Sequence, residues 1–431
     1  MSFFNNFEDI LNQKHPLYVL AQEIDWGQFD EAFLPLYCQD NGRPAKPIRL
    51  MVGLLILKHL RNVSDEVVVE QWAENSYYQY FCGEKSFVPN VPCNASELVH
   101  FRNRIGESGI ELILKESIRV NGKDGDDDDV NIDTTVQEKN ITFPTDAKLH
   151  KKIIRQCQQI AADEQLPVRQ TYTRTLKKLA LDQRFRNHPR NKAKARKADR
   201  RIKTIAGRLV RELERNLPPN SIYQTSIALF KQILSQTRGS KNKIYSLHEP
   251  EVCCISKGKE HKKYEFGNKA SFVKTDSGVL VGALGFRNQY DGHTLPAVLD
   301  QVERLTGKRP KNAKVDRGYR GKKQVGETAI LIPSTPKKNL SYYMRKKLSQ
   351  AHRKRAAIEP IIGHLKSDHR LGRNFYKGVV GDNINIMLAA AAFNFKRMMN
   401  KWKSSFLSFF QMLYYSIMKL IFNQNRAELT F

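Results

Sequence analysis

The sequence predicts a mixed α/β protein, a sheet with a helical block inserted after its first strand, preceded by an all-helical domain at the N-terminus. Three observations carry this prediction. The N-terminal residues show helical patterns, β-type runs begin near residue 130 and return only after residue 250, and the residues between them carry no strand pattern. The expected domains are residues 1–120, then 121–147 together with 245–400, the insertion 148–244, and an apolar C-terminal helix at 401–431.

The composition is that of a globular and strongly basic protein. Hydrophobic residues make up 40% of the chain and charged residues 27%, which excludes wholesale disorder. Lysine and arginine outnumber aspartate and glutamate by 72 to 44, which gives a formal net charge of +28. Such an excess suits a long polyanion, because its phosphates release counterions when basic side chains neutralise them. Nucleic acid is therefore the expected partner.

The N-terminal region predicts three helices. Pro47 precedes the apolar segment Ile48–Leu60, and proline is favoured where helices begin. Ser64 is placed to cap a second helix with an acidic first turn, and a third helix is expected around 96–119. The first two helices are compatible with a helix-turn-helix, which places its second helix in a DNA major groove. An ordinary helical bundle explains the same pattern equally well.

Two charged stretches lie before and after the first strand. Residues 122–129 (GKDGDDDD) are expected to form a solvated acidic linker, because consecutive acids cannot all face one ion. Residues 184–203 hold ten Lys or Arg and a single acid, Asp199. A basic helical face of this density favours phosphate contacts. The helix is expected to pack through an apolar seam of Ile202, Ile205, Leu209 and Leu213.

Strands return after residue 250. Three β-type runs are expected at 252–255, 264–274 and 278–286, with a hairpin turn at Asp276-Ser277-Gly278. The remaining elements follow in the order helix, strand, strand and helix, at 295–305, 313–315, 329–332 and from about 342.

Cysteine usage and the two ends of the chain bear on its compartment. The six cysteines show no CxxC pair and no metal-ligand spacing, as expected for reduced thiols in a cytosolic protein. The first residues carry acids and amides where a secretion signal would be basic. The apolar segment Phe406–Phe422 is short for a membrane span and contains Gln411 and Lys419. It is expected to dock on a core or on a partner rather than to enter a membrane.

Three carboxylates far apart in sequence form the candidate catalytic centre. Asp133 ends an apolar run with alternation, Asp316 ends a strand that includes Ala313, and Glu359 lies on the basic helix. Carboxylates are the hard oxygen ligands that divalent cations require. Two such ions about 4 Å apart clamp the attacking and leaving oxygens of a phosphodiester. We therefore expect Asp133 to bridge two divalent cations, with Asp316 and Glu359 each completing one.

Basic residues accompany Glu359 on its helix. Arg355 lies one turn before it and Lys366 two turns after it, so the three side chains project towards similar sides. Pro360, directly after the glutamate, indicates a kink or a break there. The helix is expected to present one acid and two phosphate clamps at the edge of a cleft.

Three segments resemble the motifs of the DDE transposases of bacterial insertion sequences, in the group named after insertion sequence five. The first-Asp motif of that family matches DTTVQEKNITFPTDAKL, the second matches VDRGYRG, and the third matches HRKRAAIEPIIGHLKSDHRLGR. The third motif has the pattern Tyr-x2-Arg-x3-Glu-x6-Lys, and His352 stands where that pattern has Tyr. The match runs from about residue 15 to 400. The DNA contacts expected with these motifs are Arg355, Lys366, His352, Arg317 and Arg373.

The resemblance implies a ribonuclease-H-like catalytic domain, an N-terminal helical domain that helps to bind transposon ends, and Mg²⁺-dependent cut-and-insert chemistry. Water would free a 3′-hydroxyl at the transposon end, and that hydroxyl would attack target DNA without a covalent enzyme–DNA intermediate. The implied partners are double-stranded DNA (terminal inverted repeats and target) and a second copy of the chain or more, in the cytoplasm on the nucleoid. His293, in the family-like segment NQYDGHTLPAVL, would either touch DNA or the site, or help to begin a helix.

Three other functions fit part of the sequence. A ribonuclease-H-like endonuclease without strand transfer would share the first chemical step. A DNA-binding protein without catalysis explains the charge but not the three carboxylates. A tyrosine or serine recombinase needs a nucleophile among several arginines, and neither Tyr319 nor Tyr376 has such a set in the sequence.

Overall fold

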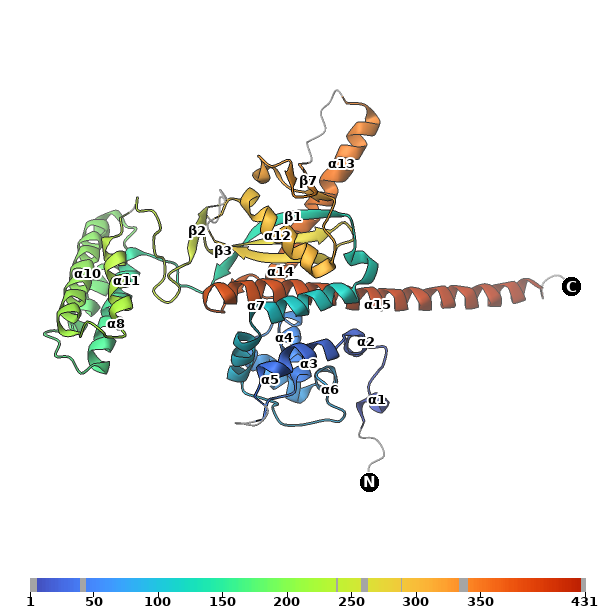
Figure 1. Ribbon diagram of the computed structural model, residues 1–431, viewed down its shortest axis with the longest axis horizontal. Helices are drawn as coiled ribbons and strands as arrows, with labels where there is room; N and C mark the ends of the chain where they lie inside the picture. The colour runs from blue at the N-terminus through green and yellow to red at the C-terminus, as the bar shows by residue number, and fades with distance from the viewer. Residues whose placement is uncertain are drawn as a thin grey trace. The chain divides into compact units, whose positions relative to one another are not determined.

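The computed structural model describes residues 6–38, 44–237, 239–256, 263–287, 289–332 and 340–427. The chain divides into two compact units (Figure 1). The sheet unit contains the residues up to Glu138 and those from Asn268 onward, and the helical unit contains Lys139–Gly267. Within the described part of the chain, no helix has the length and apolar character needed to cross a membrane.

The first part of the sheet unit is helical. Helix α4 begins directly after Pro47, as predicted, and ends at Leu60. The predicted cap is also confirmed, because the Ser64 hydroxyl accepts a hydrogen bond from the backbone N–H of Val67 at 3.3 Å. The helices are α1 (Phe7–Ile10), α2 (Pro16–Glu23), α3 (Gly27–Phe33), α4 (Ile48–Leu60), α5 (Asp65–Glu74), α6 (Ser76–Phe81) and α7 (Ala95–Val120).

These helices share one hydrophobic core with the sheet. Twelve of the thirteen residues of α4 are buried, as expected for a helix that is apolar on every side. The same cluster of buried side chains extends through α7 to Val130 and Ile132 on the first strand. Figure 1 shows α7 lying alongside α15 (Gly378–Ala427), whose buried residues belong to this core as well.

The sheet is mixed, which confirms the predicted α/β class. In the sheet unit its strands follow the order β3-β1-β5-β7-β6, with β4 paired to β3 and β8 paired to β1. β1, β5 and β7 run parallel, whereas β3 with β4 and β6 with β7 are antiparallel. The strands are β1 (Asp129–Lys139), β3 (Tyr264–Thr275), β4 (Leu280–Phe286), β5 (Asn312–Lys314), β6 (Gln324–Val325), β7 (Thr328–Leu331) and β8 (Arg373–Asn374).

The predicted hairpin joins β3 to β4. Gly278 closes its turn with a φ of +98°, a value that glycine adopts without strain. α12 (Asp291–Thr306) follows β4, as the sequence predicts, and packs on it. The short strands β6 and β8 have two residues each and were not predicted.

The basic helix that was expected to carry Glu359 is two helices. One residue, Ala357, separates α13 (Tyr342–Ala356) from α14 (Ile358–Asp368). The predicted break therefore lies on the N-terminal side of Glu359. Pro360 explains its position. Proline has no N–H to donate, and in the first turn of α14 none is required.

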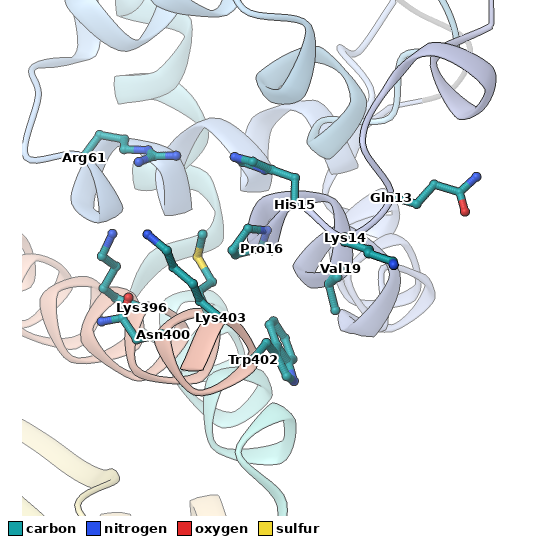
Figure 2. A pocket seen from close by; sticks show the side chains of 11 residues that line it. Gln13, Lys14, His15, Pro16, Val19, Arg61, Lys396, Asn400, Trp402 and Lys403 are labelled. Carbon is teal, nitrogen blue, oxygen red and sulfur yellow. The ribbon is translucent and has the colours of Figure 1, made fainter. Parts of the chain in front are cut away.

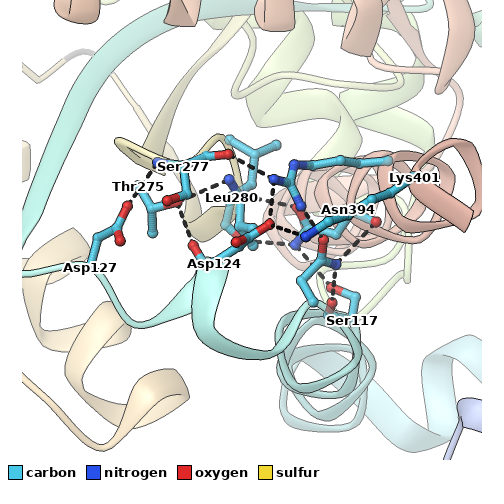
Figure 3. A network of polar contacts seen from close by, with 11 residues as sticks. Ser117, Asp124, Asp127, Thr275, Ser277, Leu280, Asn394 and Lys401 are labelled. Atoms are coloured by element: carbon cyan, nitrogen blue, oxygen red, sulfur yellow. Dashed lines mark hydrogen bonds and ion pairs between the residues drawn. The ribbon is translucent and has the colours of Figure 1, made fainter. Parts of the chain in front are cut away.

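The acidic segment before β1 is not the solvated linker that the sequence suggested. Asp124 pairs with Arg397 at 2.7 Å and with Lys401 at 3.0 Å. Figure 3 shows Asp124 and Lys401 within this polar network. The Asp127 carboxylate accepts a hydrogen bond at 2.7 Å from the backbone N–H of Ser277. The prediction failed because it considered the run alone, whereas α15 and the β3–β4 turn supply partners from far along the sequence.

The helical unit contains the predicted helical block. Its helices are α8 (Asp146–Asp163), α9 (Thr173–Asp182), α10 (Pro189–Asn216) and α11 (Gln224–Ser235), and β2 (Cys253–Ser256) pairs with the first residues of β3. The apolar seam of α10 is confirmed, because Ile202, Ile205, Leu209 and Leu213 are all buried in the core of this unit. The C-terminal segment Phe406–Phe422 lies in α15, but its side chains are outside the described part of the structure.

Candidate active site

Two of the predicted carboxylates lie on neighbouring strands. The strand end expected at Asp133 is wrong, because β1 continues to Lys139. β1 and β5 pair in parallel, with Asn131 opposite Lys314. Asp133 and Asp316 each follow two residues later, on the same side of the sheet as the residues of that pair. Asp133 remains in β1, whereas Asp316 begins a short 3-10 turn (Arg317–Tyr319) directly after its strand.

Arg355 joins all three predicted carboxylates. Its Nη1 lies 2.9 Å from Glu359 Oε1, and its Nη2 lies 3.6 Å from Asp133 Oδ2 and 3.7 Å from Asp316 Oδ2. The helical spacing predicted that Arg355 and Glu359 project towards similar sides. Their i to i+4 contact confirms this across the junction of α13 and α14. We call Asp133, Asp316, Glu359 and Arg355 the carboxylate centre.

Backbone donors fix the two aspartates. The N–H of Thr134 donates to Asp133 Oδ1 at 2.8 Å, and the N–H of Gly318 donates to Asp316 Oδ1 at 2.8 Å. A β-carbon at position 318 would come within 2.9 Å of that same Oδ1. The glycine in the turn therefore allows the Asp316 carboxylate to fold back onto its own backbone.

The carboxylate centre has a surplus of negative charge. Burial raises the pKa of Asp133 to about 6, and the charges of Asp316 and Glu359 add to the rise, while Arg355 and the N–H of Thr134 oppose it. One guanidinium faces three carboxylates, and its Nε is buried without a hydrogen-bond partner among the described residues. A cation that entered this centre would therefore relieve an electrostatic cost already present in the fold.

The chemistry of these residues fits a divalent cation, since all three supply hard carboxylate oxygens. Across the described ranges, however, no group of three or more His, Cys, Asp or Glu is arranged to hold a metal ion. The expected ligand set is thus not assembled in advance. The carboxylates pair with Arg355, and its guanidinium lies between them.

A second cluster next to the carboxylate centre was missed in the sequence. Asp276, in the β3–β4 turn, accepts hydrogen bonds from Asn131 at 2.9 Å, from Lys314 at 3.0 Å and from Lys354 at 2.9 Å. Lys354 directly precedes Arg355, so this Asp276 cluster ties the end of α13 to β1 and β5. The only sequence signal was a turn aspartate; nothing local indicates that it pairs with two distant lysines.

The other predicted DNA contacts lie on the elements that carry or adjoin the carboxylate centre. His352 is exposed on α13, one turn before Arg355, and Arg317 is exposed directly after Asp316. Lys366 is half-buried in the last turn of α14, and Arg373 is exposed in β8, which pairs with β1. His293 lies in the first turn of α12, where its ring contacts Tyr290 edge to face.

The two tyrosines considered as recombinase nucleophiles are poorly suited to that role. Tyr319 is fully buried, and burial raises the pKa of its phenol well above the ordinary value. Burial also raises the pKa of Tyr376, whose ring face is covered by Arg102 at 4.3 Å and by Lys58 at 4.6 Å. Neither hydroxyl is an exposed group that ionises readily, as covalent catalysis by tyrosine would need.

Comparison with known proteins identifies the family. A family model described as a transposase domain (DUF772) matches residues 5–104, and a model described as a transposase DDE domain matches residues 235–395. The chain is 42% identical over 193 residues to "Uncharacterized protein ORF8 in nfe locus" of Rhizobium meliloti, a match that covers 44% of this chain and 93% of the relative. No solved structure matches the chain. Asp133 lies between the two matched regions, whereas Asp316, Arg355 and Glu359 lie within the second. The chain belongs to the DDE transposases of insertion sequences.

Proposed function

We propose that this transposase cuts DNA at the ends of its insertion sequence and joins the freed 3′-hydroxyl ends to target DNA. Asp133, Asp316 and Glu359 would hold two Mg²⁺ ions, or Mn²⁺ in their place, in a ribonuclease-H-like sheet. One observation carries the proposal: residues 133, 316 and 359, distant in sequence, meet around a single guanidinium. When bound, the ions supply Lewis acidity to the phosphate and lower the pKa of the attacking water.

The side chains of the centre divide the remaining work. Asp133 is the most buried of the three acids, with 14% of its side chain exposed, against 38% for Asp316 and 59% for Glu359. It therefore provides the fixed ligand between the other two, while Glu359 at the rim adapts to the substrate. Arg355 Nη1 already donates to Glu359, whereas its Nη2 lies 3.6–3.7 Å from the aspartates, so Nη2 would be the donor to a DNA phosphate.

The DNA contacts are proposed to extend beyond the centre. Lys366, His352, Arg317 and Arg373 would hold backbone phosphates near the cut, and the exposed basic face of α10 would hold other phosphates of the DNA. Among the N-terminal helices, α5 contains four acids and no Lys or Arg. Such a helix is repelled by a major groove, so we favour a packing role for α4 and α5 over a helix-turn-helix.

Assembly and location follow from the reaction. Two transposon ends must be joined in one event, so we propose a homodimer or a higher oligomer on DNA, acting at the nucleoid in the cytoplasm. The membership in the insertion-sequence-five group, implied by the three motifs, is part of the same proposal.

The decisive experiment uses Asp133→Asn with labelled DNA that carries the two ends flanking the gene. We expect the variant to bind this DNA with unchanged affinity and to lose at least about a thousandfold in Mg²⁺-dependent cleavage, because the bridging ligand loses its charge. Asp9→Asn, an exposed acid on α1, is the matched control and should cleave as the wild type does. Full cleavage by Asp133→Asn would refute the assignment of the centre.

A nuclease without strand transfer remains the second candidate, since its first step is the same. Pre-cleaved ends and a supercoiled plasmid separate the two functions. A transposase converts the plasmid into joined products with the labelled strand attached, whereas a nuclease leaves the plasmid unlabelled. Hydrolysis without any joined product would exclude the transposase mechanism while keeping the carboxylate centre.

A further inference from the structure

A pocket of about 760 Å³ lies in the sheet unit, lined by residues from α2 and its N-cap, from the end of α4 and from α15 (Figure 2). We call it the α2–α15 pocket. Arg61 caps the C-terminus of α4, His15 caps the N-terminus of α2, and Lys396, Trp402 and Lys403 belong to α15. None of these residues belongs to the carboxylate centre or to the predicted DNA contacts.

The lining of the pocket is cationic. Figure 2 shows the side chains of Lys396 and Lys403 extending towards the guanidinium of Arg61. No Asp or Glu is among the described residues that line the pocket. Burial lowers the pKa of Lys396, and the charges of Arg61 and Lys403 lower it further, while the charge of Asp368 opposes them. Like charges held together in this way destabilise the free protein and favour an anion that neutralises them.

The pocket also offers hydrogen-bond donors. The Nε of Arg61 is buried and has no hydrogen-bond partner among the described residues. The Nδ1 of His15 accepts a hydrogen bond from the backbone N–H of Leu17 at 3.2 Å. Burial, and then the charge of Arg61, lower the pKa of His15, so its ring is neutral at pH 7. Its single proton therefore lies on Nε2, which makes that atom a donor.

We propose that the α2–α15 pocket binds phosphate groups of the DNA backbone, as a contact separate from the carboxylate centre. Arg61, Lys396 and Lys403 supply the charge, His15 supplies a neutral donor, and the Trp402 ring forms an apolar wall for the adjoining deoxyribose. A net charge of +28 favours long polyanions over free phosphate, because a polyanion releases its condensed counterions when the protein binds. The inference relies on the proposed function only in taking DNA as the partner.

The test is the salt dependence of DNA binding, measured with the full chain in EDTA so that no cleavage is required. The probe is fluorescent double-stranded DNA carrying the element's ends, with anisotropy recorded from low to moderate salt. Loss of two phosphate contacts in Lys396→Gln/Lys403→Gln should reduce the slope of log K against log salt by about 1.8. Lys85→Gln/Lys115→Gln, two exposed lysines outside the pocket, removes the same charge and should leave the slope nearly unchanged.

A single variant and a pyrophosphate titration guard against a folding defect and against binding of a free anion. Lys403→Gln alone changes an exposed side chain, and its expected slope change of about 0.9 keeps the test valid if the double variant folds poorly. Calorimetric titration with pyrophosphate distinguishes a free anion from DNA: loss of pyrophosphate binding with an unchanged DNA slope would overturn the proposal. Equal slopes in pocket and control variants would overturn it as well. Because cleavage is scored separately with Asp133→Asn, failure of this site and failure of the proposed function give different results.

Discussion

The Asp276 cluster and the carboxylate centre lie side by side on one face of the sheet, and their charges are balanced very differently. Asp276 accepts hydrogen bonds from Asn131, Lys314 and Lys354 at 2.9–3.0 Å. Burial opposes its ionisation, but these three donors lower its pKa to about 2. Asp133 lies two residues after Asn131 on β1. Burial raises its pKa to about 6, and the Nη2 of Arg355 is 3.6 Å from its carboxylate.

The difference separates a cluster whose charges the fold balances from one that keeps a surplus of negative charge. In the Asp276 cluster the fold supplies every positive charge, and the result is a fixed joint between α13 and the sheet. In the carboxylate centre the fold supplies one guanidinium for three acids and leaves negative charge to be balanced from outside. Proteins often keep such unfavourable charge arrangements at binding sites. A ligand of opposite charge relieves the repulsion when it binds, and this relief strengthens binding.

The largest effect is expected from breaking the Asp276 cluster. The folded pKa of Asp276 is lower than the unfolded value of about 3.9, so its contribution to stability is present above that value and is lost as pH falls towards 2. Asp276→Asn should therefore lower the free energy of unfolding by about 2–3 kcal/mol at pH 7. Urea unfolding followed by circular dichroism measures this, with Asp9→Asn expected to change it by less than about 0.5 kcal/mol. An unchanged midpoint would mean that the three donors find other partners.

A smaller effect of opposite sign is expected in the carboxylate centre. The folded pKa of Asp133 lies above its unfolded value, so the ionised carboxylate costs stability fully above pH 6 and not at all below about pH 4. Asp133→Asn removes this cost, and the variant should be about 1–2 kcal/mol more stable than the wild type at pH 7.5 without metal, after allowing for the lost pairing with Arg355.

The pH dependence supplies the control for that prediction. The stability gain of Asp133→Asn should shrink as pH falls through 6 and vanish near pH 4, while the loss in Asp276→Asn stays constant over the same range. Urea midpoints at pH 4.5, 6.0 and 7.5 distinguish the two. A gain that is independent of pH would show that Asp133 is not the group under electrostatic stress.

The carboxylate centre could be predicted from the sequence largely because its signals are local. Asp133 and Asp316 follow apolar strand patterns, and Arg355 precedes Glu359 by one helical turn, so periodicity alone places each side chain. The helices at 48–60 and 96–119 were predictable for the same reason. Pro360 predicted a break near Glu359. The structure places that break before the glutamate, because proline fits the first turn of a new helix.

The Asp276 cluster could not be predicted because its partners come from three distant segments. Residues 131, 276 and 354 have no mutual pattern in sequence, and only the register of β1 with β5 brings Lys314 beside Asn131. The acidic segment at 122–129 failed in the same way, since Arg397 and Lys401 approach it only after α15 has folded onto α7. Long-range ion pairs depend on topology, and topology is what the sequence patterns leave open.

The smallest effect concerns the divalent cations proposed for the carboxylate centre. If its surplus charge is meant for a divalent ion, 10 mM MgCl₂ should stabilise the wild type by roughly 1.4 kcal/mol for a Kd on the order of 1 mM, because binding to the folded state alone adds RT ln(1 + [L]/Kd). Asp133→Asn should lose most of this shift, whereas Asp276→Asn should keep it despite its lower starting stability. Thermal unfolding in MgCl₂ is compared with NaCl at equal ionic strength, so that general screening is subtracted. Equal Mg²⁺ shifts in both variants would mean that the ion binds elsewhere, and the contrast between the two clusters would then concern stability alone.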